Sequence, residues 1–136
     1  MESDNFIILV TGILRNQKNE ILLLQRSKNN NSFKGFWQMP EGKMEVGEQP
    51  EQTLARELKE ELNYKLIDSK LTLVNSTFVS LKNKSYHLLR IVLEITWKGK
   101  ITLSTEHNDY RWINVKEAIK LRNLVVGTRE ILLTQK

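Results

Sequence analysis

Two runs of sequence decide the fold of this chain: GKMEVGE at residues 42–48 and, after seven further residues, RELKEE at residues 56–61. The second run lies in a segment that starts at Pro50, a residue favoured in the first turn of a helix. Leucine recurs at every fourth position between residues 54 and 62, which is the spacing of a helix with one buried face. Asn63 is a suitable end, because asparagine tolerates the left-handed conformation that often closes a helix. We therefore expect a helix from Pro50 to Asn63.

This helix would carry three glutamates on one face. Glu57, Glu60 and Glu61 are separated by three and four residues, so their side chains lie on the same side of a helix. Three crowded carboxylates repel one another unless a cation compensates, and Mg²⁺ or Mn²⁺ suits oxygen ligands well. For the triplet alone, a solvated helix face with Arg56 paired to Glu60 or Glu48 is the simpler explanation.

The complete pattern is more specific than the triplet. The chain resembles the Nudix hydrolase family and its MutT-like members, whose signature is Gly, five residues, Glu, seven residues, then Arg-Glu-aliphatic-any-Glu-Glu-any-Gly-aliphatic. The matching residues at the required spacing are Gly42, Glu48, Arg56, Glu57, Leu58, Glu60 and Glu61. The preceding segment GFWQMP, residues 35–40, also resembles the lead into this signature, the Nudix box.

Three positions depart from the family pattern. Glu41 stands where another glycine is usual, Asn63 replaces the last glycine, and Tyr64 takes an aliphatic position. Asn63 is a mild change, whereas Glu41 either alters the loop or adds a carboxylate beside the metals. None of the three removes a charged residue that the chemistry needs.

The resemblance implies an α/β fold: a Nudix-type α/β/α sandwich with a mixed β-sheet, one domain over residues 1–136, and the box at residues 42–64. The hydrophobic pattern agrees along the chain. It predicts strands at residues 7–14, 21–24, 71–79 and 88–97, and short helices at residues 115–121 and 128–133. Residues 27–34 include three consecutive asparagines and are the expected flexible loop, a candidate gate for a site.

The composition is that of one ordinary globular domain. A chain of 136 residues can bury one core and is too short for two. Its net charge of +5 favours anionic ligands, but no run of five or six like charges indicates a nucleic-acid surface. The absence of cysteine excludes disulfides, thiolate metal sites and thiol nucleophiles. The apolar run at residues 6–10 is too short for a membrane span and follows acidic residues, so we expect a cytoplasmic protein without membrane contact. We also expect a monomer or a homodimer that binds a small nucleotide.

The resemblance also implies the roles of the box residues. Glu57, Glu60 and Glu61 would be ligands of Mg²⁺, with Mn²⁺ as an alternative ion. The carbonyl of Gly42 is a further candidate ligand. Arg56 and Glu48 would form an ion pair that orients the cluster, and the metal would neutralise phosphate oxygens and activate a water.

One carboxylate outside the helix is a candidate for completing the site. Glu106 lies before Tyr110-Arg111-Trp112, where MutT-like proteins often supply an extra ligand or base, although an ordinary loop role explains it equally well. His87 and His107 are the only histidines and have no partner at a recognisable metal or triad spacing. We expect structural or surface roles for both.

The substrate is less closely defined than the reaction. No proline follows Pro50, so the downstream proline of many ADP-ribose hydrolases is missing. This favours a (deoxy)nucleoside triphosphate, cut to the monophosphate and pyrophosphate in a MutT-like housekeeping reaction. Candidate contacts are Lys34 for the phosphates, Trp37 beside the box and Asn123 for a base edge, with packing or surface roles as the alternatives.

Other functions stay open at this point. The same metal cluster would serve an ADP-ribose, nucleotide-sugar or dinucleoside polyphosphate hydrolase. A non-catalytic module that only binds a nucleotide is an alternative of another class, although such a module has no need of three mutually repelling carboxylates. An RNA-processing Nudix enzyme would need a basic groove and usually extra domains, for which this chain leaves little room.

Overall fold

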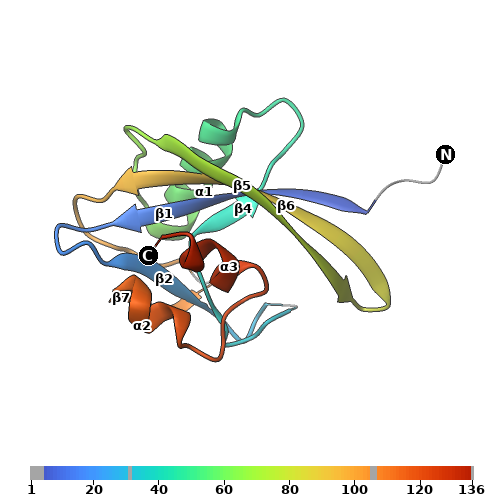
Figure 1. Cartoon of the computed structure of the whole chain (residues 1–136). Helices are drawn as coiled ribbons and strands as arrows, with labels where there is room; N and C mark the ends of the chain where they lie inside the picture. The colour runs from blue at the N-terminus through green and yellow to red at the C-terminus, as the bar shows by residue number, and fades with distance from the viewer. Residues whose placement is uncertain (1–4, 31, 105–106, 136) are drawn as a thin grey trace.

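The described part of the chain is built around a mixed sheet of seven strands (Figure 1). The computed structural model describes residues 5–30, 32–104 and 107–135. The strands are β1 (Phe6–Arg15), β2 (Ile21–Arg26), β3 (Trp37–Gln38), β4 (Glu41–Lys43), β5 (Lys70–Leu81), β6 (Lys84–Thr96) and β7 (His107–Ile113). Five of them follow one another in the order β3-β2-β1-β6-β5, while β4 pairs with β1 and β7 pairs with β2. β1 and β6 are parallel and the other described pairs are antiparallel, which confirms the predicted mixed sheet.

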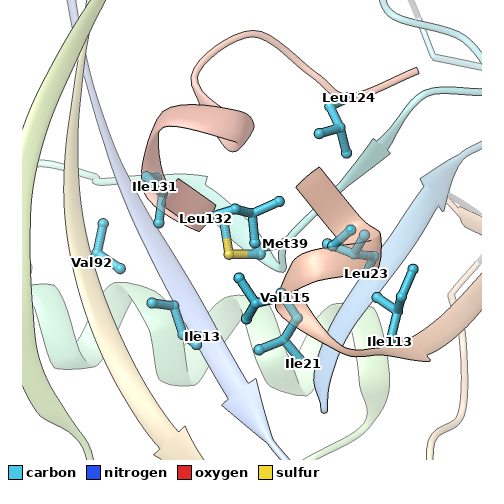
Figure 2. Packing of buried hydrophobic residues seen from close by; sticks show 11 residues of the cluster. Ile13, Ile21, Leu23, Met39, Val92, Ile113, Val115, Leu124, Ile131 and Leu132 are labelled. Atoms are coloured by element: carbon cyan, nitrogen blue, oxygen red, sulfur yellow. The ribbon is translucent and has the colours of Figure 1, made fainter. Parts of the chain in front are cut away.

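Helices cover both faces of this sheet. On one face, α1 (Pro50–Leu62) packs its leucines against apolar side chains of β1, β2 and β6. On the other face, α2 (Val115–Ile119) and α3 (Thr128–Leu133) close a second apolar cluster that includes Ile13, Val92 and Met39 (Figure 2). The α/β/α sandwich predicted from the resemblance is therefore the observed fold.

The central strands bury side chains on both faces because their sequences are almost wholly apolar. In β1, Val10 and Leu14 face α1, while Ile13 faces α2 and α3. β6 likewise sends Val92 to one cluster and Leu93 to the other, as expected for a strand covered on both faces. The antiparallel β5–β6 hairpin continues past the sandwich, away from α2 and α3 (Figure 1).

The predicted elements are all present, with shifts at their ends. β6 starts four residues earlier than predicted, and the strand expected at residues 71–79 spans Lys70–Leu81. The helix expected at residues 115–121 ends at Ile119, where the Arg129 guanidinium donates to the carbonyls of Ile119 and Leu121 and so favours an early end. The short strands β3 and β4 were not predicted, and neither was β7. The central residues of β7 are exposed and polar, so its sequence lacks the alternation of a half-buried strand.

Among the described residues, no helix is long and apolar enough to cross a membrane.

Candidate active site

Helix α1, which carries the three glutamates, has two well-defined ends. Pro50 occupies the first turn, and the backbone N–H of Gln49 donates to the Gln52 side chain at 2.7 Å. At the other end Asn63 adopts the left-handed conformation, with φ 52° and ψ 39°. The predicted helix end is thus confirmed.

Arg56 connects the loop before the helix to the glutamates on it. Its Nε donates to Glu48 Oε2 at 2.9 Å, and its Nη2 donates to Glu48 Oε1 at 3.0 Å. Its Nη1 donates to Glu57 Oε1 at 2.6 Å, and Glu60 Oε2 lies 4.0 Å from the same nitrogen. The expected ion pair between Arg56 and Glu48 is therefore formed, in the bidentate geometry that gives arginine–carboxylate pairs their strength.

Hydrogen bonding favours the charged forms of Glu48 and Arg56. The pKa of Glu48 is lowered from 4.5 to about 2, chiefly by the Arg56 hydrogen bond and then by the backbone N–H of Glu45. The same bond to Glu48 holds the pKa of Arg56 well above its usual range. The Thr53 hydroxyl adds a further hydrogen bond to Glu48, at 2.9 Å. At neutral pH the Arg56 cation is therefore paired with an ionised Glu48 between the loop and the helix.

Gly42 gives the Glu57 carboxylate the room that it occupies. A Cβ on Gly42 would lie 2.0 Å from Glu57 Cγ and 2.4 Å from Oε1, so any other residue would displace this side chain. Because β4 pairs with β1, the Gly42 backbone is held against the start of the glutamate face. Carboxylates and a backbone carbonyl are the hard oxygen ligands that Mg²⁺ prefers, so the residues at this position fit a divalent metal ion.

Glu61 is the buried member of the glutamate face. Its side chain is 3% exposed, and Oε2 lies 3.8 Å from Nε2 of His107, the first residue of β7. The Gln38 amide lies 3.4 Å from the same imidazole nitrogen, and Arg26 Nη1 donates to Gln38 Oε1 at 3.3 Å. The pKa of His107 falls from 6.5 to about 4, mainly through burial and then through the charge of Arg26.

His107 and Gln38 were not recognised in the sequence as neighbours of the site. The structural role expected for His107 agrees with its burial, but its position beside a box glutamate was not foreseen. The neighbourhood depends on β7, and the sequence of β7 gives little signal for a strand. Because β7 was not predicted, the contact between His107 and Glu61 could not be predicted either.

Glu60 differs from its neighbours because its side chain is 61% exposed. Within the residues that the structure describes, no three carboxylate or imidazole groups already surround one point closely enough to hold a metal ion. Metal binding by Glu57, Glu60 and Glu61 would require their carboxylates to converge. The flexible, exposed Glu60 side chain can move with little disturbance of the fold.

The three candidate substrate contacts lie along one edge of the sandwich. The Trp37 N–H donates to the Asn123 carbonyl at 2.6 Å, and the Val125 N–H donates back to the Trp37 carbonyl at 2.9 Å. The structure therefore brings Trp37 and Asn123 together through their backbones. The Trp37 ring is half-buried with Arg111 5.7 Å from its centre, and Lys34 is exposed in the loop before β3. Glu106, the proposed extra ligand, lies outside the described residues.

The family follows from these features together with a direct comparison. The model of the NUDIX domain family matches residues 6–135, which is nearly the whole chain. The chain belongs to this family. Its sheet, its box helix and its Arg56–Glu48 pair are those of a Nudix hydrolase of the MutT-like type, an enzyme that acts on phosphoanhydride bonds.

Individual relatives match most of the chain, and two of them are solved structures with a similar fold. The nucleoside triphosphatase NudI of Salmonella paratyphi B is 29% identical over 119 residues, which cover 82% of this chain and 84% of that protein. The MutT protein of Methanosarcina mazei Go1 is 26% identical with a TM-score of 0.83, covering 98% of this chain and 95% of its own. A MutT NUDIX hydrolase from Burkholderia pseudomallei has the same TM-score at 21% identity, covering 98% of this chain and 100% of its own.

Proposed function

We propose that this Nudix hydrolase cuts a (deoxy)nucleoside triphosphate into the monophosphate and pyrophosphate with Mg²⁺ as its cofactor. Glu57, Glu60, Glu61 and the Gly42 carbonyl are the proposed ligands. The observation that carries the proposal is the close fit of Gly42 against Glu57, with Arg56 bridging Glu57 and Glu48. This arrangement holds one of the proposed carboxylate ligands against the backbone of Gly42.

The chemistry needs a water aligned with a phosphorus atom. Bound Mg²⁺ supplies the charge that neutralises phosphate oxygens and activates water. The water would give up a proton to a carboxylate base while its oxygen forms a bond to phosphorus, the bridging phosphorus–oxygen bond breaks, and pyrophosphate leaves. Arg56 contributes by keeping Glu57 in place, and Glu61 contributes a carboxylate held beside His107. Glu106 is the candidate for one more ligand or for the base.

Two observations support a nucleoside triphosphate as the substrate. NudI, the relative described above, is named a nucleoside triphosphatase, and it matches most of this chain. The chain also has no proline after Pro50. For the nucleotide itself we propose Lys34 as a phosphate contact, Trp37 as a surface beside the base, and Asn123 as a contact to a base edge.

The test is a hydrolysis screen of the purified protein with separated products. The panel contains the nucleoside triphosphates and their deoxy forms, oxidised guanine nucleotides, ADP-ribose, nucleotide sugars, dinucleoside polyphosphates and a capped RNA. We expect Mg²⁺-dependent release of pyrophosphate and a monophosphate from a nucleoside triphosphate. Hydrolysis of ADP-ribose or a dinucleoside polyphosphate, with no hydrolysis of any nucleoside triphosphate, would contradict the proposed substrate. It would still agree with the proposed class of reaction.

A binding protein without turnover has a distinct outcome. Folded protein that binds a nucleotide in calorimetry but hydrolyses none of the panel would contradict the enzymatic proposal. Glu60→Gln serves as the matched inactive control, because its side chain is exposed.

We also propose that the protein is cytoplasmic and is a monomer or a homodimer. Light scattering, compared with the chain mass of 16.0 kDa, tests the oligomeric state.

A further inference from the structure

Glu41, which departs from the family pattern, lies in a buried polar network on the far side of the sheet. Its Oε2 accepts from Arg90 Nε at 3.0 Å and from Thr11 Oγ1 at 2.8 Å. Arg90 Nη2 also donates to Glu41 Oε1 at 3.4 Å and to the Val126 carbonyl at 2.9 Å. The network joins β4, β1 and β6 to the segment that leads into α3.

Burial makes this ion pair unusual. The Arg90 side chain is 1% exposed and the Glu41 side chain 12% exposed. Charged groups this deep in a protein are tolerated only when a partner and further hydrogen bonds satisfy them. Loss of either partner would leave the other charge buried, so the two residues act as one unit.

Strand geometry places Glu41 and Gly42 on opposite faces of the sheet. Successive side chains of a strand point to opposite sides, and a Cβ on Gly42 would point at Glu57 of α1. Glu41 points the other way, toward Arg90 and the α3 side. Glu41 therefore adds no carboxylate beside the proposed metal ligands, which answers the alternative left open by the sequence.

Backbone contacts hold β4 in addition to Glu41. The Gly12 N–H donates to the Pro40 carbonyl at 2.8 Å, the Met44 N–H donates to the Ile8 carbonyl at 2.9 Å, and Arg56 Nη2 donates to the Lys43 carbonyl at 3.0 Å. β4 is three residues long and pairs with β1 alone, through Leu9↔Lys43, Val10↔Gly42 and Thr11↔Glu41. These backbone bonds place β4 beside β1, and its side-chain contacts add to them on the face away from α1. Of its three residues, Glu41 is the one whose side chain is fixed by both a buried cation and a hydroxyl.

The far end of the network is equally constrained. Gly127, just before α3, has φ 91°, and a Cβ there would lie 2.1 Å from Arg90 Nη1. Arg90 is therefore enclosed by Gly127 and the Val126 carbonyl on one side and by Glu41 on the other. The guanidinium cannot shift without moving β4 or the start of α3.

We infer that Glu41 is a positioning residue for the proposed metal site: paired with Arg90, it fixes β4 so that Gly42 stays against Glu57. The inference rests on the proposed function, because it concerns the ligands of the same metal. Glu41 acts through the backbone of β4 and touches neither metal nor nucleotide. Residues that orient metal ligands change metal affinity by roughly ten- to a hundredfold when they are replaced.

The test measures Mn²⁺ binding by electron paramagnetic resonance, without substrate, for wild type, Glu41→Gln and Thr11→Val. Glu41→Gln removes the charge of the pair, and Thr11→Val removes one hydrogen bond at nearly constant shape. We expect the Mn²⁺ dissociation constant to rise by roughly ten- to a hundredfold in Glu41→Gln and by a smaller factor in Thr11→Val. Urea denaturation in metal-free buffer must show both variants folded at the assay temperature, because excess Mn²⁺ would also restore a merely destabilised protein by binding its folded state.

Glu94→Gln is the matched control, since Glu94 accepts from Arg15 Nε at 2.7 Å between β6 and β1 and lies away from β4. It should leave the Mn²⁺ dissociation constant unchanged. If folded Glu41→Gln binds Mn²⁺ with wild-type affinity, the positioning role of Glu41 is wrong, while the proposed metal site stands. If Glu41→Gln does not fold, wild-type Mn²⁺ affinity in folded Thr11→Val overturns the inference instead. A wild-type protein that binds no Mn²⁺ would overturn the proposed metal site as well.

Discussion

Arg56 organises the charges of the box because it is held by two acids at once. Its guanidinium bridges Glu48 in the loop and Glu57 on the helix, and it approaches Glu60 more loosely. A lysine could not offer the planar fork that binds both carboxylate oxygens of Glu48. The glutamates therefore differ in their freedom to move: Glu57 is held, Glu61 is buried, and Glu60 is exposed.

We expect Glu60→Gln to lower kcat by about a hundredfold or more, because loss of a direct metal ligand should exceed the roughly ten- to hundredfold effect of losing a residue that only orients a ligand. Its exposed side chain should make the change in unfolding free energy less than about 0.5 kcal/mol. Steady-state kinetics at saturating Mg²⁺ and urea denaturation check the two parts. Glu51→Gln, in the exposed first turn of the same helix, is the control and should keep full activity. Wild-type turnover in Glu60→Gln would remove this carboxylate from the mechanism.

The buried imidazole of His107 gives the protein an acid-sensitive stability. Its pKa is about 4 when folded and 6.5 when unfolded, so the unfolded chain takes up the proton first as the pH falls. Folding stability should therefore decline between about pH 6.5 and pH 4 and show no further loss from this group below pH 4.

Replacing the imidazole should flatten this decline. In metal-free buffer, wild type should lose up to about 1.4 kcal/mol of unfolding free energy per pH unit more than His107→Gln across that range. Urea denaturation at several pH values between 7.5 and 4 measures both slopes. Parallel curves for the two proteins would show that His107 does not carry the effect.

At the level of elements, helix α1 was largely predictable because local signals agree. Pro50 at its start, leucines at every fourth position and Asn63 at its end each favour the same helix, and no tertiary contact is needed to see it. The glutamate face and the Arg56–Glu48 spacing follow from that helix. The box could thus be located from the sequence before any coordinates were known.

The left-handed conformation of Asn63 explains why this departure from the family glycine is tolerated. Asn63→Gly should change the unfolding free energy by less than about 0.5 kcal/mol, because both residues adopt positive φ readily. Asn63→Ala should cost about 1 kcal/mol, because alanine lacks the short polar side chain that lets asparagine adopt the left-handed region. Urea denaturation of the two variants beside wild type measures the difference. Equal stability of both would mean that the helix end relaxes to another conformation.

The contacts that the sequence did not reveal are those between distant elements. Glu41 and Arg90 are 49 residues apart, and their pairing depends on β4 and β6 both lying beside β1. The neighbourhood of Glu61 and His107 depends on an edge strand whose residues are mostly polar and exposed. Hydrophobic period and motif spacing carry no information on either pairing.

For the whole molecule, metal binding should be visible as stability. An ion that binds only the folded state at ten times its dissociation constant adds about 1.4 kcal/mol. In a chain of this size we expect the melting temperature to rise by roughly 4–6 °C. Calorimetry in MgCl₂ against NaCl of equal ionic strength measures the shift, which Glu60→Gln should reduce. Identical melting in both salts would favour the solvated helix face considered for the glutamates at the outset.

The parallel pairing of β1 with β6 has a consequence for how the protein is made. β1 registers with β6 along its whole length, from Phe6↔His87 to Arg15↔Thr96. During synthesis from the N-terminus, β1 and β2 leave the ribosome long before the strand that covers the other edge of β1. The centre of the sheet is therefore among the last parts to close. A chain interrupted before Thr96 would expose an apolar strand edge, the kind of surface through which nascent chains pair with one another.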